Sequence, residues 1–310
     1  MVDLSILIVC YNSRSYIADC LSGLYEHTKE CDYEVLLVDC SNDGTVDLVK
    51  SRFPQTRIIE NTQNLGYGLG NNFLANHAQG KFLLLLNPDV IVSDDAIGEL
   101  YRTANAMPEA GAVGGVTRLP DGSHDPGCRQ TVPTLFRLLV AAAGGGRFLN
   151  GALADNATEA AEVETLSGAF MLVRRDAWDQ VEGFDTSFFM YSEELDLCQR
   201  LKTMGWKIVM TPRAKIIHLV GGGQNQSPRR ILLIAQARMH FFRKYWSRPK
   251  VVVGGALVWL HAMIRVVAAT VAGRIVGGKR AEGLKHAYEG IVFKPESWWH
   301  GYQRNDSGTK

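Results

Sequence analysis

Short apolar runs alternate with helix-length amphipathic stretches through the first 115 residues, and this alternation limits the fold more than any other feature of the sequence. The runs that predict strands lie at 4–10 (LSILIVC), 33–39 (YEVLLVD), 57–60, 81–86 and 112–116. The stretches that predict helices lie at 14–28, 44–52, 68–79 and 94–106. Such alternation is typical of a parallel sheet covered by helices. We therefore predict an α/β fold with a Rossmann-like, mostly parallel sheet and flanking helices.

A second, shorter α/β pass follows in the middle of the chain. It comprises an expected strand at 169–173, helices at 175–181 and 193–204, and strands at 207–210 and 214–218. From Pro228 onward the pattern is largely helical. We predict two units, an α/β domain over residues 1–225 and a basic, amphipathic helical segment over residues 226–310.

Composition excludes several classes of protein. The 310 residues are 46% apolar and 21% charged, which rules out a disordered or collagen-like chain. The six cysteines form no Cys-x-x-Cys pair and lack the histidine spacing of a zinc site, so we expect reduced, buried thiols. The N-terminus lacks the basic region of a secretory signal, and its short apolar run fits a buried strand.

Charge is divided unevenly along the chain. Residues 1–196 hold 28 acidic and 13 basic side chains, whereas residues 197–281 hold 16 basic and no acidic ones. This asymmetry indicates an anionic surface as partner, with a solvated basic face as the alternative. The apolar stretch at 251–276 is interrupted by a histidine and two arginines, which favours an interfacial helix on an anionic membrane over a spanning helix. A core helix is the alternative there. Long aliphatic stretches between the basic residues argue against nucleic acid as partner.

Polar side chains follow three of the expected strands where each one ends. They are Tyr11 and Asn12, Asp39, and Asn87 and Asp89. Because ligands bind outside the carboxyl ends of parallel strands, we expect these groups to share one edge. Asp39 suits a nucleobase N–H or a ribose hydroxyl, with a capping and turn residue as the alternative. Because Asp43 already supplies the following turn, we expect no local partner for Asp39. Asp89 suits Mg²⁺ or Mn²⁺, with a simple Asn-Pro-Asp turn as the alternative.

A glycine- and asparagine-rich stretch, ENTQNLGYGLGNN at 60–72, follows the third expected strand. Its glycines, at positions 66, 68 and 70, lack the last interval of a dinucleotide fingerprint and do not follow the first strand, which disfavours a hydride-transfer cofactor. We predict an amide-rich loop entering a helix, with side chains that bond to ribose or phosphate. These side chains are Asn61, Asn64, Asn71 and Asn72.

Acidic residues gather at the start of the helix expected at 193–204. Glu193 and Asp196 share one helical face, and Glu194 lies in the first turn. The aromatic residues before them favour a partly desolvated pocket, in which a carboxylate becomes a useful general base. Acids with a purely structural role at a helix start are the alternative. His218, at the end of the last strand, is predicted to contact a diphosphate or its metal, or else to be a strand-end histidine without a ligand.

Several motifs occur along the chain in a characteristic order. They are VCYNS, VDCSNDGT, NLGYGLGNN, LLNPD, SGAFMLVRR, GFDTSFFMYSEELDLCQR and HLVGGG. Together they resemble the pattern of glycosyltransferase family 2, in the branch of bacterial rhamnosyltransferases of cell-surface polysaccharide synthesis, over roughly residues 4–220. The resemblance implies a GT-A fold and inverting transfer from a nucleotide-activated sugar.

The same resemblance implies a role for each matching residue. Tyr11, Asn12 and Asp39 would hold the base and ribose, Asn64 and Gly66 would line the nucleotide, and Gly168 and Ala169 would lie along the acceptor channel. Asp89 takes the place of the metal-binding carboxylate in the Asp-x-Asp motif, whose first position is here Asn87. The catalytic base would be Glu194, because Glu193-Glu194 stands where the family has Glu-Asp, and Asp196 is a second candidate. His218 is left with a less defined role.

The resemblance also implies a reaction and its setting. We expect transfer of L-rhamnose from dTDP-L-rhamnose onto a polyprenyl-diphosphate-linked or glycan acceptor, with Mg²⁺ or Mn²⁺ as cofactor. The protein would be cytoplasmic and peripheral on the inner face of the plasma membrane, held there by its basic helices. Two alternatives remain open: a family-2 transferase that uses a UDP-hexose or UDP-N-acetylhexosamine, and a non-catalytic protein that binds nucleotide sugars.

Overall fold

Nine strands form one sheet in the computed structural model, which describes residues 2–61, 63–125, 128, 131–145, 158–219, 227–275 and 279–302. The strands are β1 (Leu4–Cys10), β2 (Tyr33–Asp39), β3 (Arg57–Ile58), β4 (Phe82–Leu86), β5 (Val90–Ile91), β6 (Ala110–Arg118), β7 (Ala161–Glu162), β8 (Phe170–Arg174) and β9 (Lys207–His218). Their order is β3-β2-β1-β4-β8-β6-β9-β5, and β7 pairs with β9. The first four strands of this order are parallel, as predicted, whereas β8 runs antiparallel between β4 and β6.

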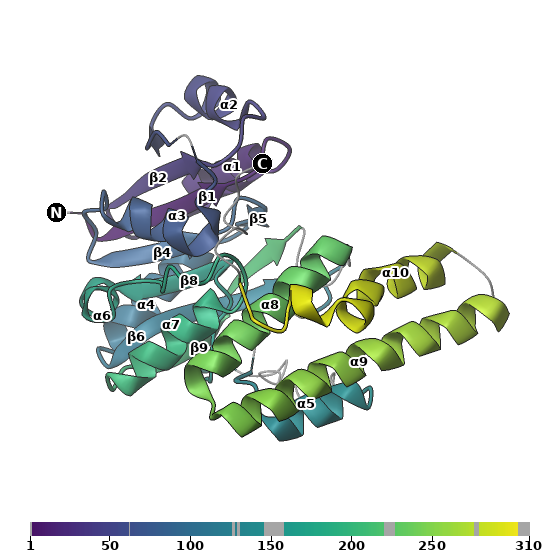
Figure 1. The fold of residues 1–310 in the computed structure, drawn as a ribbon. Coiled ribbons are helices and arrows are strands. Elements are labelled where there is room, and N and C mark those ends of the chain that lie inside the picture. The colour runs from purple at the N-terminus through teal and green to yellow at the C-terminus, as the bar shows by residue number, and fades with distance from the viewer. Residues whose placement is uncertain are drawn as a thin grey trace.

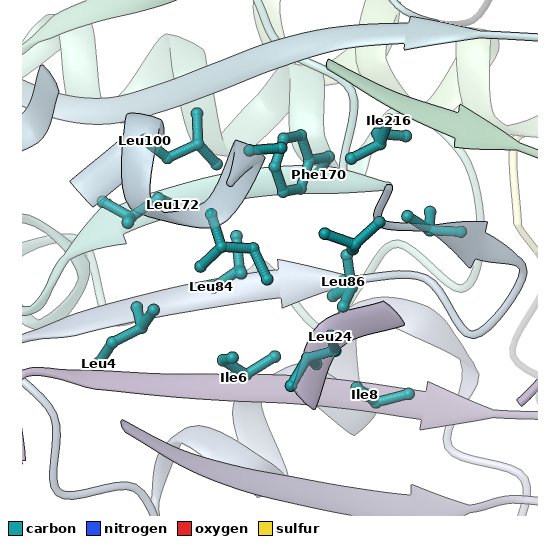
Figure 2. Packing of buried hydrophobic residues seen from close by; sticks show 14 of the residues in the cluster. Leu4, Ile6, Ile8, Leu24, Leu84, Leu86, Leu100, Phe170, Leu172 and Ile216 are labelled. Atoms are coloured by element: carbon teal, nitrogen blue, oxygen red, sulfur yellow. The ribbon is translucent and has the colours of Figure 1, made fainter. Parts of the chain in front are cut away.

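Helices cover both faces of this sheet (Figure 1). They are α1 (Ile17–His27), α2 (Thr45–Arg52), α3 (Gly66–Ala75), α4 (Ala96–Ala106), α6 (Arg175–Gln180) and α7 (Glu193–Thr203). On one face, residues of α1 and α4 pack with alternate residues of the central strands, as Figure 2 shows for Leu24, Leu100 and Leu84. On the other face, residues of α3, α6 and α7 pack on the intervening strand residues. The unbroken apolar runs of β1 and β4 are therefore explained by burial on two faces.

The structure corrects several expected element boundaries. Lys207–His218 is one strand that contains Pro212, whereas two strands, at 207–210 and 214–218, were predicted. The register against β6 shifts between Gly114 and Val116, and such an irregularity accommodates a proline inside a strand. The short strands β5 and β7 and the helix α5 (Leu135–Ala142) were not predicted. The glycines and prolines at 117–133 and 144–151 predict loop-rich stretches, and much of the second stretch lies outside the described residues.

The chain after Pro228 forms α8 (Pro228–Tyr245), α9 (Arg248–Ile275), α10 (Lys279–Phe293) and a short 3-10 helix, Pro295–Ser297. A third apolar cluster joins these helices to the loop before α7 and to α7 itself, since Phe188 and Leu195 are buried in it together with Phe242 and Trp298. Figure 1 shows α8 alongside β9 and α7, with α5 against α9. The helical segment therefore packs directly on the α/β unit, and its separateness as a domain stays a prediction.

Candidate active site

The carboxyl ends of β1 and β2 form the first part of the site. Cys10 and Asp39 are directly opposite in the parallel register, so Asn12 and Asp39 share one edge as predicted. Asp39 is 7% exposed, and its Oδ1 accepts hydrogen bonds from the Ser41 amide (3.0 Å) and hydroxyl (2.8 Å). Burial raises the pKa of Asp39 against the effect of these bonds. The expectation that Asp39 has no local partner was therefore wrong. Tyr11, at the same edge, is half exposed and accessible to a flat ring.

Gly66 and Gly70 lie in the first turns of α3 and allow this helix to pack closely on its neighbours. Asn64 Oδ1 accepts from the Gly66 amide at 3.0 Å. Gly66 has φ of +69°, and a Cβ there would lie 2.6 Å from the Phe189 carbonyl oxygen. A Cβ on Gly70 would lie 2.8 Å from a methyl group of Val9. These close approaches bring the predicted nucleotide loop against both β1 and the segment before α7.

All four asparagines predicted to bond with ribose or phosphate have protein partners, and that of Asn64 is the Gly66 amide. Asn71 Nδ2 donates to the Tyr67 carbonyl at 3.0 Å, and Asn61 Nδ2 donates to the Gln63 carbonyl. The Asn72 amide donates to the Phe184 carbonyl (2.8 Å) and accepts from the Phe184 N–H (2.9 Å). This reciprocal pair joins α3 to the loop before α7, so Asn72 has a structural role.

His218 lies between two carboxylates at the end of β9. Its Nδ1 is 2.9 Å from Asp125 Oδ2, and its Nε2 is 3.3 Å from Asp89 Oδ1. Burial alone would lower the pKa of His218, but the hydrogen bonds and charges of Asp125 and Asp89 raise it to about 9. Val90 pairs with His218, so β5, which follows Asp89, is held against the end of β9. Asp125 was missed because it is far from His218 in sequence and belongs to no recognised motif.

The donors at this edge suit a hard divalent ion only in part. Within the described part of the chain, no group of three or more histidine, cysteine or acidic side chains is arranged to hold a metal. Asp89 and Nε2 of His218 face each other, while Asp125 holds the opposite ring nitrogen and so orients the imidazole. One carboxylate and one imidazole fit an ion that takes its remaining ligands from substrate phosphates and water. In binding a metal, His218 would release its Nε2 proton.

Gly168 and Ala169 lie between the sheet edge that carries Asp89 and the helix α7. The backbone N–H of Asn87 donates to the Ala169 carbonyl at 3.1 Å, and the Tyr67 hydroxyl donates to the Gly168 carbonyl at 2.6 Å. Burial, followed by the charges of Glu193 and Glu194, raises the pKa of Tyr67 well above its usual value. Tyr67 was not singled out from the sequence. The bond from Asn87 places Gly168 and Ala169 beside the Asn-Pro-Asp turn. The bond from Tyr67 places them beside a side chain that senses the charges of both acids.

The acid pair at the start of α7 is buried. Glu193 is 4% exposed and Glu194 8% exposed. Burial and the charge of Glu194 raise the pKa of Glu193 well above its usual range. The two residues before them, Tyr191 and Ser192, have φ of +70° and +65°, which is rare for residues other than glycine. The backbone is thus turned sharply to aim the two carboxyl groups.

The surroundings of Asp196 do not suit its predicted role as the second candidate for the catalytic base. It is fully buried, and its Oδ2 accepts from Arg200 Nε at 2.7 Å. Its Oδ1 accepts from the Tyr245 hydroxyl (2.7 Å) and lies 2.5 Å from Lys244 Nζ. A carboxylate held by two cations and a phenol has protein partners on both of its oxygens.

Comparison with known proteins identifies the family. The family described as "Glycosyltransferase like family 2" matches residues 3–243. The chain belongs to this family. It is 31% identical to the N-acetylglucosaminyl-diphospho-decaprenol L-rhamnosyltransferase of Mycobacterium tuberculosis (strain CDC 1551 / Oshkosh), over 84% of this chain and 93% of that protein. It is 26% identical to the poly-beta-1,6-N-acetyl-D-glucosamine synthase of Staphylococcus aureus (strain COL), over 70% of this chain and half of that protein.

A solved structure agrees with the fold of this glycosyltransferase. A mannosyltransferase from Pyrobaculum calidifontis, in complex with GDP-Man and Mn²⁺, superposes with a TM-score of 0.58 over 97% of this chain and 85% of its own. At 19% identity this likeness concerns the fold alone. The protein therefore has the predicted GT-A architecture, and the resemblance to family 2 and its rhamnosyltransferases is confirmed.

Proposed function

We propose that this glycosyltransferase moves L-rhamnose from dTDP-L-rhamnose onto a polyprenyl-diphosphate-linked acceptor, with inversion at the anomeric carbon. The observation that carries the proposal is the buried Glu193–Glu194 pair, joined through Tyr67 and Gly168 to the edge that holds Asp89 and His218. The named activity of the mycobacterial relative supports L-rhamnose as the transferred sugar and a lipid-linked diphosphate as the acceptor. A UDP-hexose or UDP-N-acetylhexosamine donor and a glycan acceptor remain alternatives, the former supported by the staphylococcal relative.

The proposed step is a single displacement. Glu194 takes the proton of an acceptor hydroxyl, whose oxygen forms the new bond to the anomeric carbon as the bond to the departing diphosphate breaks. Burial and the charge of Glu194 raise the pKa of Glu193, which disfavours a second negative charge next to that base. On the donor side, Asp89 and His218 would hold Mg²⁺ or Mn²⁺, which supplies positive charge to the leaving diphosphate. Asp39 and Asn12 face the nucleoside.

The test of the donor is a panel of dTDP-, UDP- and GDP-sugars with Mn²⁺ or Mg²⁺ and membrane lipid extract, measuring release of nucleoside diphosphate. Release from dTDP-L-rhamnose above the other donors is expected. Asp89→Ala should lower kcat by about 100-fold, the usual effect of removing one group that stabilises developing charge. Asp47→Ala, an exposed carboxylate on α2, is the control. Donor binding without turnover, even with lipid extract, would instead favour the non-catalytic alternative.

The described structure contains one helix long and apolar enough to cross a membrane, Arg248–Arg274, of which a third is buried. Its exposed apolar side chains form one stripe, opposite the buried Val258, Ala262 and Val266. We name this stripe, with the exposed Phe136 and Leu139 of α5, the lipid-facing patch. Its members on α9 are Val252, Val253, Leu260, Ile264, Val267 and Val271. Since α9 is packed along one side and the surrounding sequence is basic, we propose that it lies on an anionic leaflet.

Flotation with anionic vesicles tests the patch. The variant Phe136→Ser with Val267→Ser should bind at least about 100-fold more weakly, because each buried side chain of this size contributes about 1.5 kcal/mol or more. Met204→Ser, which removes an equally exposed apolar side chain outside the patch, should bind as the natural protein does. Equal binding of all three proteins would contradict a role for the patch. Unchanged binding in 1 M salt would contradict the contribution of anionic lipid.

A further inference from the structure

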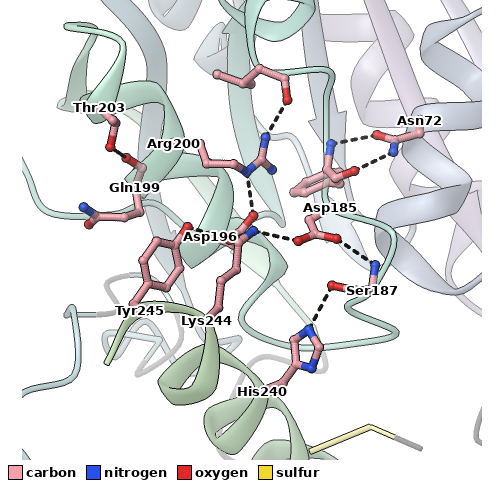
Figure 3. A network of polar contacts seen from close by, with 12 residues as sticks. Asn72, Asp185, Ser187, Asp196, Gln199, Arg200, Thr203, His240, Lys244 and Tyr245 are labelled. Atoms are coloured by element: carbon pink, nitrogen blue, oxygen red, sulfur yellow. Dashed lines mark hydrogen bonds and ion pairs between the residues drawn. The ribbon is translucent and has the colours of Figure 1, made fainter. Parts of the chain in front are cut away.

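Asp196 lies one helical turn beyond the acid pair, yet two of its three polar contacts come from α8. Its Oδ1 lies 2.5 Å from Lys244 Nζ and accepts from the Tyr245 hydroxyl at 2.7 Å, while its Oδ2 accepts from Arg200 at 2.7 Å (Figure 3). The carboxylate is fully buried. A buried charge requires such compensation, so α7 depends on the helix that follows β9.

Lys244 extends the same network to the start of the loop. Its Nζ lies 2.6 Å from Asp185 Oδ2, and Asp185 Oδ1 accepts from the Ser187 amide at 2.9 Å. Burial would raise the pKa of Asp185, but the bonds from Lys244 and Ser187 lower it to about 2. His240 Nε2, one turn earlier on α8, lies 2.8 Å from the Ser187 hydroxyl. One helix thus holds both ends of the segment 185–196 (Figure 3).

The segment between these two ends requires external support. Tyr191 and Ser192 adopt left-handed backbone conformations, which are strained for residues with side chains. Ser192 makes no side-chain cap to α7. The acid pair and Asp196 also place three buried carboxyl groups within four residues. Without nearby cations, this part of the chain would relax and the carboxyl groups would turn toward water.

We propose that Asp196, Lys244 and Tyr245 form a positioning clamp that keeps Glu194 aimed at the acceptor hydroxyl. The inference rests on the proposed role of Glu194 and adds the residues that set its geometry. Lys244 and Tyr245 act through Asp196 and do not touch substrate. The helical segment therefore contributes to turnover through α8, in addition to any contact that α9 makes with lipid.

The test compares Tyr245→Phe and Lys244→Gln with Lys50→Gln, which removes an exposed lysine of α2. The two clamp variants should lower kcat at least about 10-fold, since a misplacement of about 1 Å at a reacting group costs up to 100-fold. KM and Kd for the sugar nucleotide should stay within about twofold, because the donor edge is untouched. Lys244→Arg, which keeps the positive charge on Asp185 and Asp196, should recover most of kcat.

A second readout does not depend on catalysis. Amide hydrogen exchange over residues 190–196 should be faster in both clamp variants than in Lys50→Gln, at temperatures where all the proteins remain folded. If the natural protein transfers sugar and the variants match it in kcat and in exchange rate, the clamp proposal is overturned. If the natural protein accepts no sugar nucleotide, the proposed function fails, and exchange alone decides the clamp. If the clamp variants lose kcat, donor affinity and Tm together, Lys244 and Tyr245 have a general stabilising role, and the clamp proposal is also overturned.

Discussion

Glu194→Gln is expected to lower kcat by about 100-fold to 10,000-fold and to leave the Kd for the sugar nucleotide within about twofold. The amide keeps the size of the side chain and cannot accept the acceptor's proton. Donor affinity should persist because Asp39, Asp89 and His218 lie at the ends of other strands. Steady-state kinetics with lipid extract give kcat, and calorimetry with the nucleoside diphosphate gives the affinity.

The neighbouring carboxyl group provides a matched control. Burial and the charge of Glu194 raise the pKa of Glu193, so Glu193→Gln should change the charge of the pair less than Glu194→Gln does. We expect this variant to keep kcat within about 10-fold of the natural protein, since its main change is one altered buried hydrogen-bonding group. The reverse ranking, with Glu193→Gln inactive and Glu194→Gln active, would exchange the two roles. Equal activity of both would remove the pair as the source of the base.

The sequence predicted well those elements whose signal is local. The strands at 4–10 and 33–39 were found with their observed bounds, because each is a mostly apolar run with a polar residue at or just after its end. The shared edge of Asn12, Asp39 and Asp89 then followed from the rule for parallel strands. The short β5 was missed because its two residues are defined by pairing with His218, a contact made far along the chain.

Side-chain roles were harder to predict wherever a distant partner decides them. Asn72 was assigned to ligand because an amide near a helix start resembles a phosphate contact, but its partner is the backbone of Phe184, 112 residues away. Asp196 was retained as a candidate base because its helical position is suitable. Its real partners, Lys244 and Tyr245, lie in a segment that the charge pattern had set apart. Spacing within a motif cannot distinguish a carboxylate that faces substrate from one that is paired with a lysine of a distant helix.

A chain ending at residue 225 is expected not to form a folded transferase. The deletion would expose Phe188 and Leu195, whose burial contributes about 1.5–3 kcal/mol each. It would also remove two of the three groups that bond to the buried Asp196, and breaking such a buried pair costs about 3–5 kcal/mol. These losses together approach the 5–15 kcal/mol by which a typical protein is stable. Near-ultraviolet circular dichroism and thermal melting measure the outcome.

The matched control for this deletion is a chain ending at Tyr302, which keeps every contact that the structure describes and should melt as the full chain does. The comparison decides between two views of the helical segment. If residues 226–310 are an independent membrane-associating unit, the shorter chain melts cooperatively, binds the nucleoside diphosphate and loses only vesicle binding. If α8 completes the core and the clamp, cooperative melting and donor binding are lost together. The family match, which extends to residue 243, and the burial of Phe188 against Phe242 both support the second outcome.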